Sequence, residues 1–462
     1  MSASFGGKAR TTLLTLCAPL LFEGMSLSSI NVQLAAIRRD LGLPDSQLQM
    51  VAGAFLATYA GFLLLGGRLG DRWGRRRVFL IGVTIFGSAS LGAALAWDGW
   101  SLIAARACQG VGAAVTAPAA VALIVAAFPL GAARGWALGV LSAMGAVGFS
   151  LGVVAGGVLT ELLGWRGTFV CYLPLALVTV LVGAFVLRGP GEPSRAATTV
   201  AWIPALLITT GLILAVYGLG RIGAASAAGV LGPLGVGALL FVTFAFTQVR
   251  DREPLLPRTL LGNPRLTAAG CALAGTFAGI TGAMFVTGIH LQDGHGYSPA
   301  AAGFAFLPQG IAVACCSPVA GRLAHRYSAQ RLLLGGLLTV SAGLFLYIGV
   351  ERGGYLTHMA PAAILVGAGI AACYPAAVML ASAAAAEGEQ ATASGILTTY
   401  QQAGSALGIA VATAIQAIGP SRNWFGPAAL WGCFAFSIAA LIGCAVLLAA
   451  SATRRSRVVV PL

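Results

Sequence analysis

The chain has 462 residues, of which 58% are hydrophobic and 9% are charged, and its formal net charge is +14. A soluble domain has about 45–50% apolar and about 25% charged residues, so this composition excludes an ordinary soluble fold and indicates a polytopic helical membrane protein. The positive charge does not indicate nucleic-acid binding, because basic and aromatic residues do not interleave along the chain.

Fourteen apolar segments are each long enough to cross about 30 Å of hydrocarbon as a helix. They are separated by short loops, so no soluble domain fits between them. Charged, proline-containing connectors flank the seventh and eighth segments. We therefore expect an all-α membrane protein with two six-helix bundles, in 1–190 and 265–462, and two inserted helices within 191–264. The predicted spans are 11–34, 47–67, 78–97, 101–127, 136–162, 166–187, 199–220, 224–248, 266–291, 299–321, 330–350, 359–384, 389–417 and 427–450.

The distribution of basic residues supports this count. If the N-terminus lies inside and the spans alternate, 20 of the 27 Lys and Arg residues fall on the inner side and six on the outer side, with Arg106 inside a span. Cytoplasmic loops of membrane proteins carry such an excess. We therefore expect a multi-pass protein of the cell membrane, plasma or inner, with both termini in the cytoplasm.

The second and third predicted spans are joined by the sequence GRLGDRWGRRR, residues 67–77. Topology alone explains most of its arginines, but Asp71 could also pair with one of them, and such a pair could break when helices move. A weaker copy, AGRLAHRYSAQR, occupies 320–331, with Gly67 aligned to Gly321. Repeated halves are expected of secondary transporters.

Two charged residues lie within predicted spans. Glu23 is near the middle of the first span, where a carboxylate is costly unless it is paired, hydrated or protonated. It is the leading candidate to bind either a proton or a cationic substrate, although it could instead be fixed by helix–helix hydrogen bonds. Arg106 stays positively charged. It could sense the protonation of Glu23, or it could bond to helix carbonyls.

Other polar residues within spans are weaker candidates, since each alone is more often a packing residue. For a mainly apolar substrate cavity we select Asn31, Gln33, Gln109, Tyr374 and Gln402; Tyr217, His290, Gln309, Tyr400 and Gln401 are further possibilities. Gly148, Gly152 and Gly156 recur every four residues and indicate a helix face for close packing.

The sequence contains no motif typical of an enzyme or a cofactor site. Its nine cysteines lack CxxC spacing, no paired Cys and His ligands for a metal occur, and neither GxxxxGK[ST] nor HExxH is present. We therefore expect no cofactor, no metal, no enzymatic activity and no ATP-driven transport.

Taken together, these motifs resemble the major facilitator superfamily, and more narrowly its fourteen-span drug:proton antiporters, over nearly the whole chain. The resemblance is carried by GRLGDRWGRRR, by LIAARACQGVGAA in the fourth span and by GVVAGG in the fifth. The chain departs from the family at Val153, where the exporter motif has proline, and at Ser26, where the first span usually has aspartate.

The resemblance implies roles for three groups of residues. Proton coupling falls to Glu23, three residues before the position of the family's aspartate and chosen for its charge within an apolar span, together with Arg106 of the fourth-span motif. A gating loop would latch the two halves when the outside is open, through Gly67, Arg68, Asp71, Arg72, Gly74, Arg75 and Arg76. The exporter-motif helix would seal the cavity against leaks, through Gly148, Gly152, Gly156 and Gly157.

The function expected from the sequence is proton-driven efflux of amphipathic small molecules by alternating access, with antibiotic resistance or self-resistance as its consequence. We expect a monomer whose partners are substrate, protons and lipid. A proton-coupled metabolite importer of the same fold is the alternative, which Val153 keeps open. A membrane receptor or scaffold would need neither Glu23 nor Arg106.

Overall fold

The computed structural model describes residues 7–129, 131–187, 202–223, 225–251, 254–260, 262–350, 354–385, 389–418 and 427–458. Among these residues every regular element is helical. The boundary predicted at 190/191 lies outside them, as do Arg188, Arg195, Arg252, Arg352 and Arg422 of the charge count. The elements are α1 Gly7–Leu41, α2 Asp45–Trp73, α3 Arg75–Ala94, α4 Gly99–Ala127, α5 Ala132–Val186, α6 Trp202–Gly220, α7 Ala227–Arg250, α8 Pro264–Ile289, the π-helix η1 His290–Gly294, α9 Pro299–Ala305, α10 Leu307–Arg326, α11 Ala329–Tyr347, the π-helix η2 Tyr355–Met359, α12 Ala360–Ala384, α13 Gln390–Ile418 and α14 Pro427–Val458.

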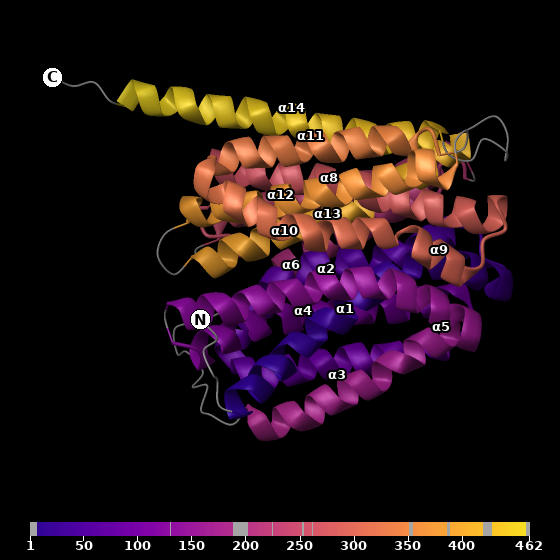
Figure 1. Ribbon diagram of the computed structural model, residues 1–462, viewed down its shortest axis with the longest axis horizontal. Coiled ribbons are helices and arrows are strands. Elements are labelled where there is room, and N and C mark those ends of the chain that lie inside the picture. The colour runs from indigo at the N-terminus through magenta and orange to yellow at the C-terminus, as the bar shows by residue number, and fades with distance from the viewer. Residues whose placement is uncertain are drawn as a thin grey trace.

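The helices form two packed groups, which Figure 1 shows one above the other. In the first group α1 packs on α5, and α4 packs on α2 and α3. In the second group α8 packs on α13 and α14, and α12 packs on α10 and α11. We call these the first and second groups. The two groups meet where α2 contacts α13 and where α5 contacts α9 and α10.

The helices α6 and α7 pack on each other at the edge of this arrangement. α6 also contacts α2 and α13, so it covers a place where the two groups meet. The side-chain amide nitrogen of the buried Gln49 donates to the carbonyl of Val216 at 2.6 Å, which ties α2 to α6. α7 has Leu231, Leu239 and Val249 more than 60% exposed. Such an apolar exterior suits contact with lipid.

Twelve helices of the described chain are long and apolar enough to cross a membrane. α5 is counted once among them, although it has 55 residues and is broken at Gly164, where φ is 72°. The break falls between the predicted spans 136–162 and 166–187. α13, which corresponds to the predicted span 389–417, is not among the twelve. The count of fourteen spans therefore stays a prediction.

The loop predicted between the second and third spans is shorter than expected. Residues 67–72 continue α2, and Arg75 and Arg76 open α3, so only Gly74 separates the two helices. Apolar length underestimates a helix because backbone hydrogen bonding continues past the last apolar turn. In the repeated motif α10 ends at Arg326 and α11 begins at Ala329. With Gly321 aligned to Gly67, Ala329 aligns with Arg75, so the second helix begins at the same position of both copies.

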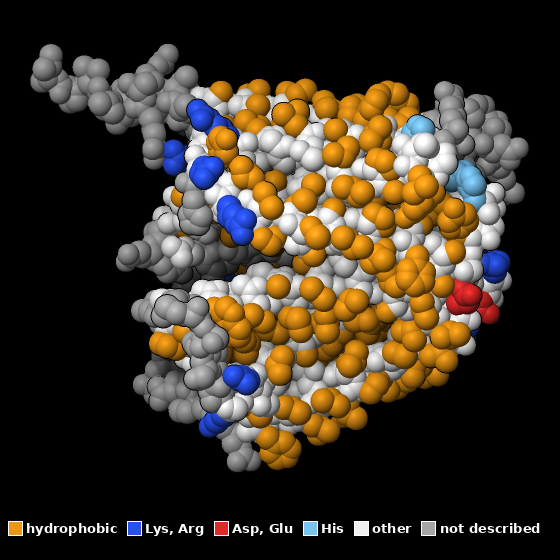
Figure 2. Space-filling view, viewed as in Figure 1, with side chains coloured by type: hydrophobic (Ala, Val, Ile, Leu, Met, Phe, Trp, Pro, Cys, Tyr) orange, Lys and Arg blue, Asp and Glu red, His pale blue; other side chains and the backbone are white. Residues whose placement is uncertain are grey.

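The two ends of the molecule differ in charge. Figure 2 shows most Lys and Arg side chains of this face at the end where α1 begins and α14 ends, and the acidic side chains at the opposite end. We call these the terminal end and the far end. Figure 2 also shows a recess between the two groups at the terminal end, whereas the groups are in contact toward the far end.

Candidate functional site

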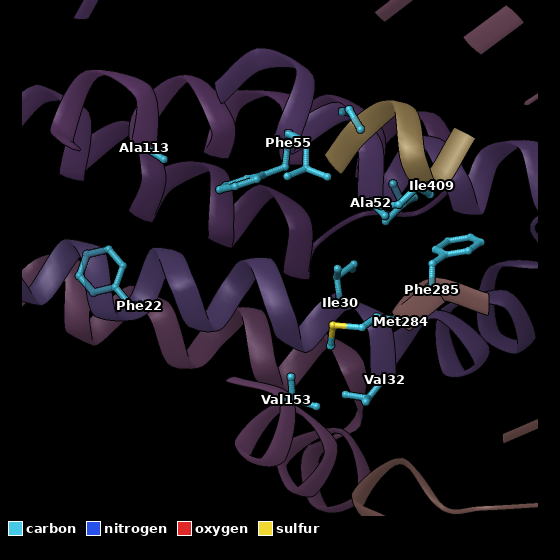
Figure 3. Packing of buried hydrophobic residues seen from close by; sticks show 14 of the residues in the cluster. Phe22, Ile30, Val32, Ala52, Phe55, Ala113, Val153, Met284, Phe285 and Ile409 are labelled. Carbon is cyan, nitrogen blue, oxygen red and sulfur yellow. The ribbon is translucent and has the colours of Figure 1, made fainter. Parts of the chain in front are cut away.

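A small pocket lies between the two groups of helices. Figure 3 shows Ala52 of α2 beside Ile409 of α13, and Ile30 of α1 near Met284 of α8. The lining is apolar apart from Asn31 and Thr281, and the enclosed volume of about 10 Å³ has room for about one water molecule. The residues that line it are Leu27, Ile30, Asn31, Ala52, Leu56, Phe149, Thr281 and Ile409.

Glu23 lies on α1, one helical turn before Leu27 of the pocket lining, so the two side chains share a helix face. The Glu23 side chain is 4% exposed, and its Oε1 has no hydrogen-bond partner among the described residues. The four ion pairs between described side chains do not include it. A buried carboxyl group of this kind is stable only when it carries a proton or meets a cation.

Arg106 on α4 is fully buried and is held by three helices. Its Nη1 donates to Ser26 Oγ at 2.8 Å and to Gln109 Oε1 at 2.9 Å, and its Nε donates to the carbonyl of Val51 at 3.3 Å. The guanidinium also lies 4.7 Å from the ring centroid of Phe55. The structure therefore gives Arg106 neutral acceptors and an aromatic face, with Ser26 where the resemblance implies an aspartate.

The residues proposed for a substrate cavity fall in different places. Asn31 lines the pocket. Gln109 is fully buried between α3 and α4, where it donates to Ser90 Oγ at 2.8 Å. Gln33 is 1% exposed, and neither end of its amide has a partner among the described residues. Gln402 is also buried, with its Oε1 unpartnered in the described part of the chain.

Two aromatic pairs lie in the interior, one in each group of helices. Phe55 and Tyr59 of α2 meet edge to face, with centroids 5.8 Å apart. Phe277 of α8 and Tyr374 of α12 do the same at 6.5 Å. Tyr59 interacts electrostatically with both Glu23 and Tyr374. Tyr59 is not among the residues predicted for the cavity, although its spacing of three and seven residues from Leu56 and Ala52 places it on the pocket-facing side of α2.

The other candidates lie further away. Tyr217 on α6 accepts a hydrogen bond from Arg221 at 2.6 Å, beyond the two groups. His290 opens η1 at the far end, where its ring centroid is 4.6 Å from that of His295. The histidine that the sequence presents as isolated therefore has a second imidazole beside it.

The gating loop is bonded on two sides. Arg76 Nη2 donates to the carbonyl of Ala184 on α5 at 2.7 Å, within the first group. Arg68 Nη2 donates to the carbonyl of Pro254, in the segment before α8. Asp71 Oδ1 lies 3.4 Å from Arg75 Nη2, and both side chains are almost half exposed. A surface pair of this kind contributes about 0–1 kcal/mol, so it can break and re-form readily.

Replacing Gly74 by Ala is expected to destabilise the protein by about 1 kcal/mol. Gly74 has φ 91°, a conformation that a residue with a Cβ adopts only with strain. Thermal unfolding of the purified protein measures the effect. Gly135→Ala is the matched control, because a Cβ at this helical glycine meets open space. Equal melting temperatures for the two variants would contradict the prediction.

The glycines of the exporter motif lie where α5 meets its neighbours. A Cβ on Gly148, Gly152 or Gly156 would overlap the backbone or side chain of α1. Gly157 faces the carbonyl of Pro299 on α9, in the second group, where a Cβ would also overlap. Three of the four predicted glycines therefore pack within the first group, and the fourth lies where the two groups meet.

Sequence comparison finds a family model and named relatives. The model "Major Facilitator Superfamily" matches residues 16–409 and 268–459. The chain is 36% identical to the puromycin resistance protein pur8 of Streptomyces alboniger, over 87% of this chain and 81% of that protein. It is 32% identical to the cephamycin export protein CmcT of Amycolatopsis lactamdurans, over 90% and 86%. It is 31% identical to the multidrug resistance protein Stp of Mycobacterium tuberculosis, over 88% and 76%.

Solved structures with low sequence identity share the fold. The human organic anion transporter MFSD10 matches with a TM-score of 0.65 at 16% identity, over 94% of this chain and 99% of that one. The POT family transporter PepTSo matches with a TM-score of 0.68 at 15% identity, over 97% and 98%. The family model over residues 16–409 and the relatives at 31–36% identity show that the chain is a multi-pass membrane transporter of the Major Facilitator Superfamily.

Proposed function

We propose that the protein is an efflux transporter that exchanges an amphipathic small molecule for protons. The observation that carries this proposal is the Glu23 carboxyl group, which is buried beside a pocket between the two groups and has neither an ion-pair partner nor a hydrogen bond to Oε1 among the described residues. The names of the relatives, which refer to resistance and export, support the direction of transport.

The exchange follows from a single carboxyl group. A proton and a cationic group cannot both neutralise Glu23, so binding of one favours release of the other. In the state open to the terminal end, the substrate cation displaces the proton. In the state open to the far end, a proton displaces the substrate. Arg106 has its own acceptors in the first group, so its position does not depend on which cation neutralises Glu23.

The chemistry of the pocket suits an amphipathic substrate with an aromatic part. We propose that separation of the groups enlarges this small pocket, so that its apolar lining accepts the body of the molecule and the ring pairs Phe55–Tyr59 and Phe277–Tyr374 accept an aromatic or cationic group. The two pairs belong to opposite groups of helices. A bound molecule that contacts both would therefore experience the relative movement of the groups.

The placement in the cell forms part of the same proposal. The terminal end, where Lys and Arg gather, would face the cytoplasm, and the protein would lie in the cell membrane. Two bundles over 1–190 and 265–462, joined by the inserted helices, would rock against each other as alternating access requires. We propose a monomer as the transporting unit.

Release of protons on substrate binding tests the exchange. Purified protein in detergent and weak buffer receives puromycin or the lipophilic cation ethidium, and a pH indicator records the protons released. The wild type is expected to release protons, and Glu23→Gln, which carries no ionisable group at this position, is expected to release none. Binding without proton release in the wild type would overturn the exchange at Glu23.

A proton-coupled importer of the same fold is the second candidate. It is favoured by Val153, which replaces the proline of the exporter motif. Val153 is buried, and its carbonyl oxygen faces Gly303 of α9, where an added Cβ would lie 2.6 Å away. Proteoliposomes distinguish the two directions. If uptake of a labelled metabolite into the vesicles increases when the proton gradient is directed inward, the importer is favoured.

A further inference from the structure

Polar contacts connect the two groups of helices at the far end of the molecule. Arg38 Nη1 of α1 lies 3.0 Å from Asp293 Oδ2 of η1. The amide nitrogen of Gln292, also in η1, donates to the carbonyl of Val32 of α1 at 3.1 Å. The backbone N–H of Ala300 donates to Glu161 Oε2 of α5 at 3.2 Å. The far end is therefore held closed by bonds from one group to the other.

The backbones are also close at this end. A Cβ on Gly288 of α8 would lie 2.7 Å from the carbonyl oxygen of Asn31, and one on Gly303 of α9 would lie 2.6 Å from that of Val153. Such contacts exist only while the far end is closed. The polar bonds lie beside them and break together with them if the groups separate.

Two of these donors also have a partner within their own group. Arg38, which bonds to Asp293 across the groups, also bonds to Asp45 at the start of α2 in its own group. Gln292, which donates to Val32 across the groups, also donates to the carbonyl of Gly288 at 3.2 Å in its own group. Each donor is thus shared between one acceptor in each group.

We propose that four residues form a far-end latch: Arg38, Asp45, Gln292 and Asp293. The partner across the groups stabilises the closed far end, and the partner within the group lowers the free-energy cost of opening it. An unpaired buried donor, or a charge left without its partner, carries a large penalty. The Arg38 side chain is 27% exposed, so part of that penalty applies to it. When the groups separate, Arg38 keeps Asp45 and Gln292 keeps Gly288.

The end of α1, which carries Arg38, is fixed within the first group. Two residues after Arg38, Asp40 bonds to Arg166, and its Oδ2 accepts from Trp165 Nε1 at 3.0 Å. Both partners lie on α5 just beyond its break at Gly164. The end of α1 therefore moves with α5 as one body, so a separation of the groups acts directly on the bond from Arg38 to Asp293.

The latch rests on the alternating access of the proposed function, and it predicts opposite effects for two similar substitutions. Asp293→Asn weakens only the closed far end and is expected to raise the ratio of far-end-open to far-end-closed molecules about two- to fivefold. Asp45→Asn leaves the closed bond to Asp293 intact but removes the partner that Arg38 keeps on opening. It is expected to lower the same ratio by a similar factor.

Double electron–electron resonance measures the distance between two spin labels and thereby the ratio of far-end-open to far-end-closed molecules. The labels are attached to cysteines that replace Trp97, which follows α3, and Leu356 of η2, which precedes α12; each is 80% exposed, and the order of the elements puts both at the far end. The full-length chain, with its native cysteines replaced, is reconstituted in lipid nanodiscs without substrate or proton gradient. A monodisperse elution profile confirms that each variant is folded.

Each outcome decides the proposal. An increased long-distance fraction for Asp293→Asn together with a decreased one for Asp45→Asn supports the latch. A shift of both variants in the same direction, or no shift in either, overturns it. Since the measurement uses neither substrate nor a proton gradient, its failure is separate from a failure of proton release, which would overturn the proposed exchange but not the latch.

Discussion

Proteoliposomes that contain Glu23→Gln are expected to lose proton-driven accumulation of ethidium or puromycin by at least about tenfold, while they still exchange labelled for unlabelled probe. The amide has almost the shape of the carboxyl group and lies in the same buried position beside the pocket. It cannot release a proton, so the coupling between the two gradients is lost. A tenfold loss corresponds to about 1.4 kcal/mol of coupling free energy.

The pH dependence of binding gives a second readout of the same variant. In the wild type, acidification places a proton on Glu23 and weakens binding of a cationic probe. In Glu23→Gln binding is expected to be independent of pH. Asp98→Asn is the matched control: Asp98 caps α4 at the surface by accepting from the N–H of Ser101 at 2.8 Å, and asparagine caps helices equally well. Uphill transport that survives in Glu23→Gln would assign proton coupling to another group.

The second large effect is expected from one added methyl group on α5. A Cβ at Gly152 would overlap the Cα and carbonyl oxygen of Met25, so Gly152→Ala forces α1 and α5 apart. Backbone atoms cannot change rotamer to make room. We expect destabilisation of about 1–3 kcal/mol or more, as in overpacked cores, together with reduced yield of folded protein.

A glycine three to four turns earlier on the same helix is the control. A Cβ at Gly139 meets open space, and alanine has a higher helix propensity than glycine, so Gly139→Ala is expected to be neutral or stabilising by up to about 1 kcal/mol. Thermal unfolding of the two variants and the wild type decides the question. If both variants have the same melting temperature, close packing of α1 on α5 is not the reason for a glycine at position 152.

The helices and the buried charges could be predicted because they depend on local properties of the sequence. Apolar length predicts the helices, and the burial of Glu23 follows from its place within an apolar segment. The end of α2 could not be predicted in this way, since residues 67–72 include the charged Arg68, Asp71 and Arg72 but continue the helix. Hydropathy indicates where a helix meets lipid, whereas hydrogen bonding decides where it ends.

The partners of the predicted residues could not be read from the sequence. Arg106 bonds to Ser26 and to the carbonyl of Val51, and both contacts depend on how α1 and α2 are rotated about their axes. Gln109 was a plausible cavity residue by its polarity, yet that rotation places it against Ser90, inside the first group. The ion pair of Arg38 with Asp293 joins residues 255 positions apart and has no local signal.

The surroundings of Arg106 bear on how the protein is made. A guanidinium group within an apolar helix is costly to insert on its own, by about 2.5–3.5 kcal/mol. Ser26 and Val51 precede Arg106 in the chain, and Gln109 lies on the same helix. Domains and helices emerge from the ribosome in N-to-C order. When α4 enters the bilayer, the acceptors for its arginine have therefore already been synthesised. Arg106 can bond to α1 and α2 as α4 leaves the translocation machinery, so its charge is not exposed to lipid.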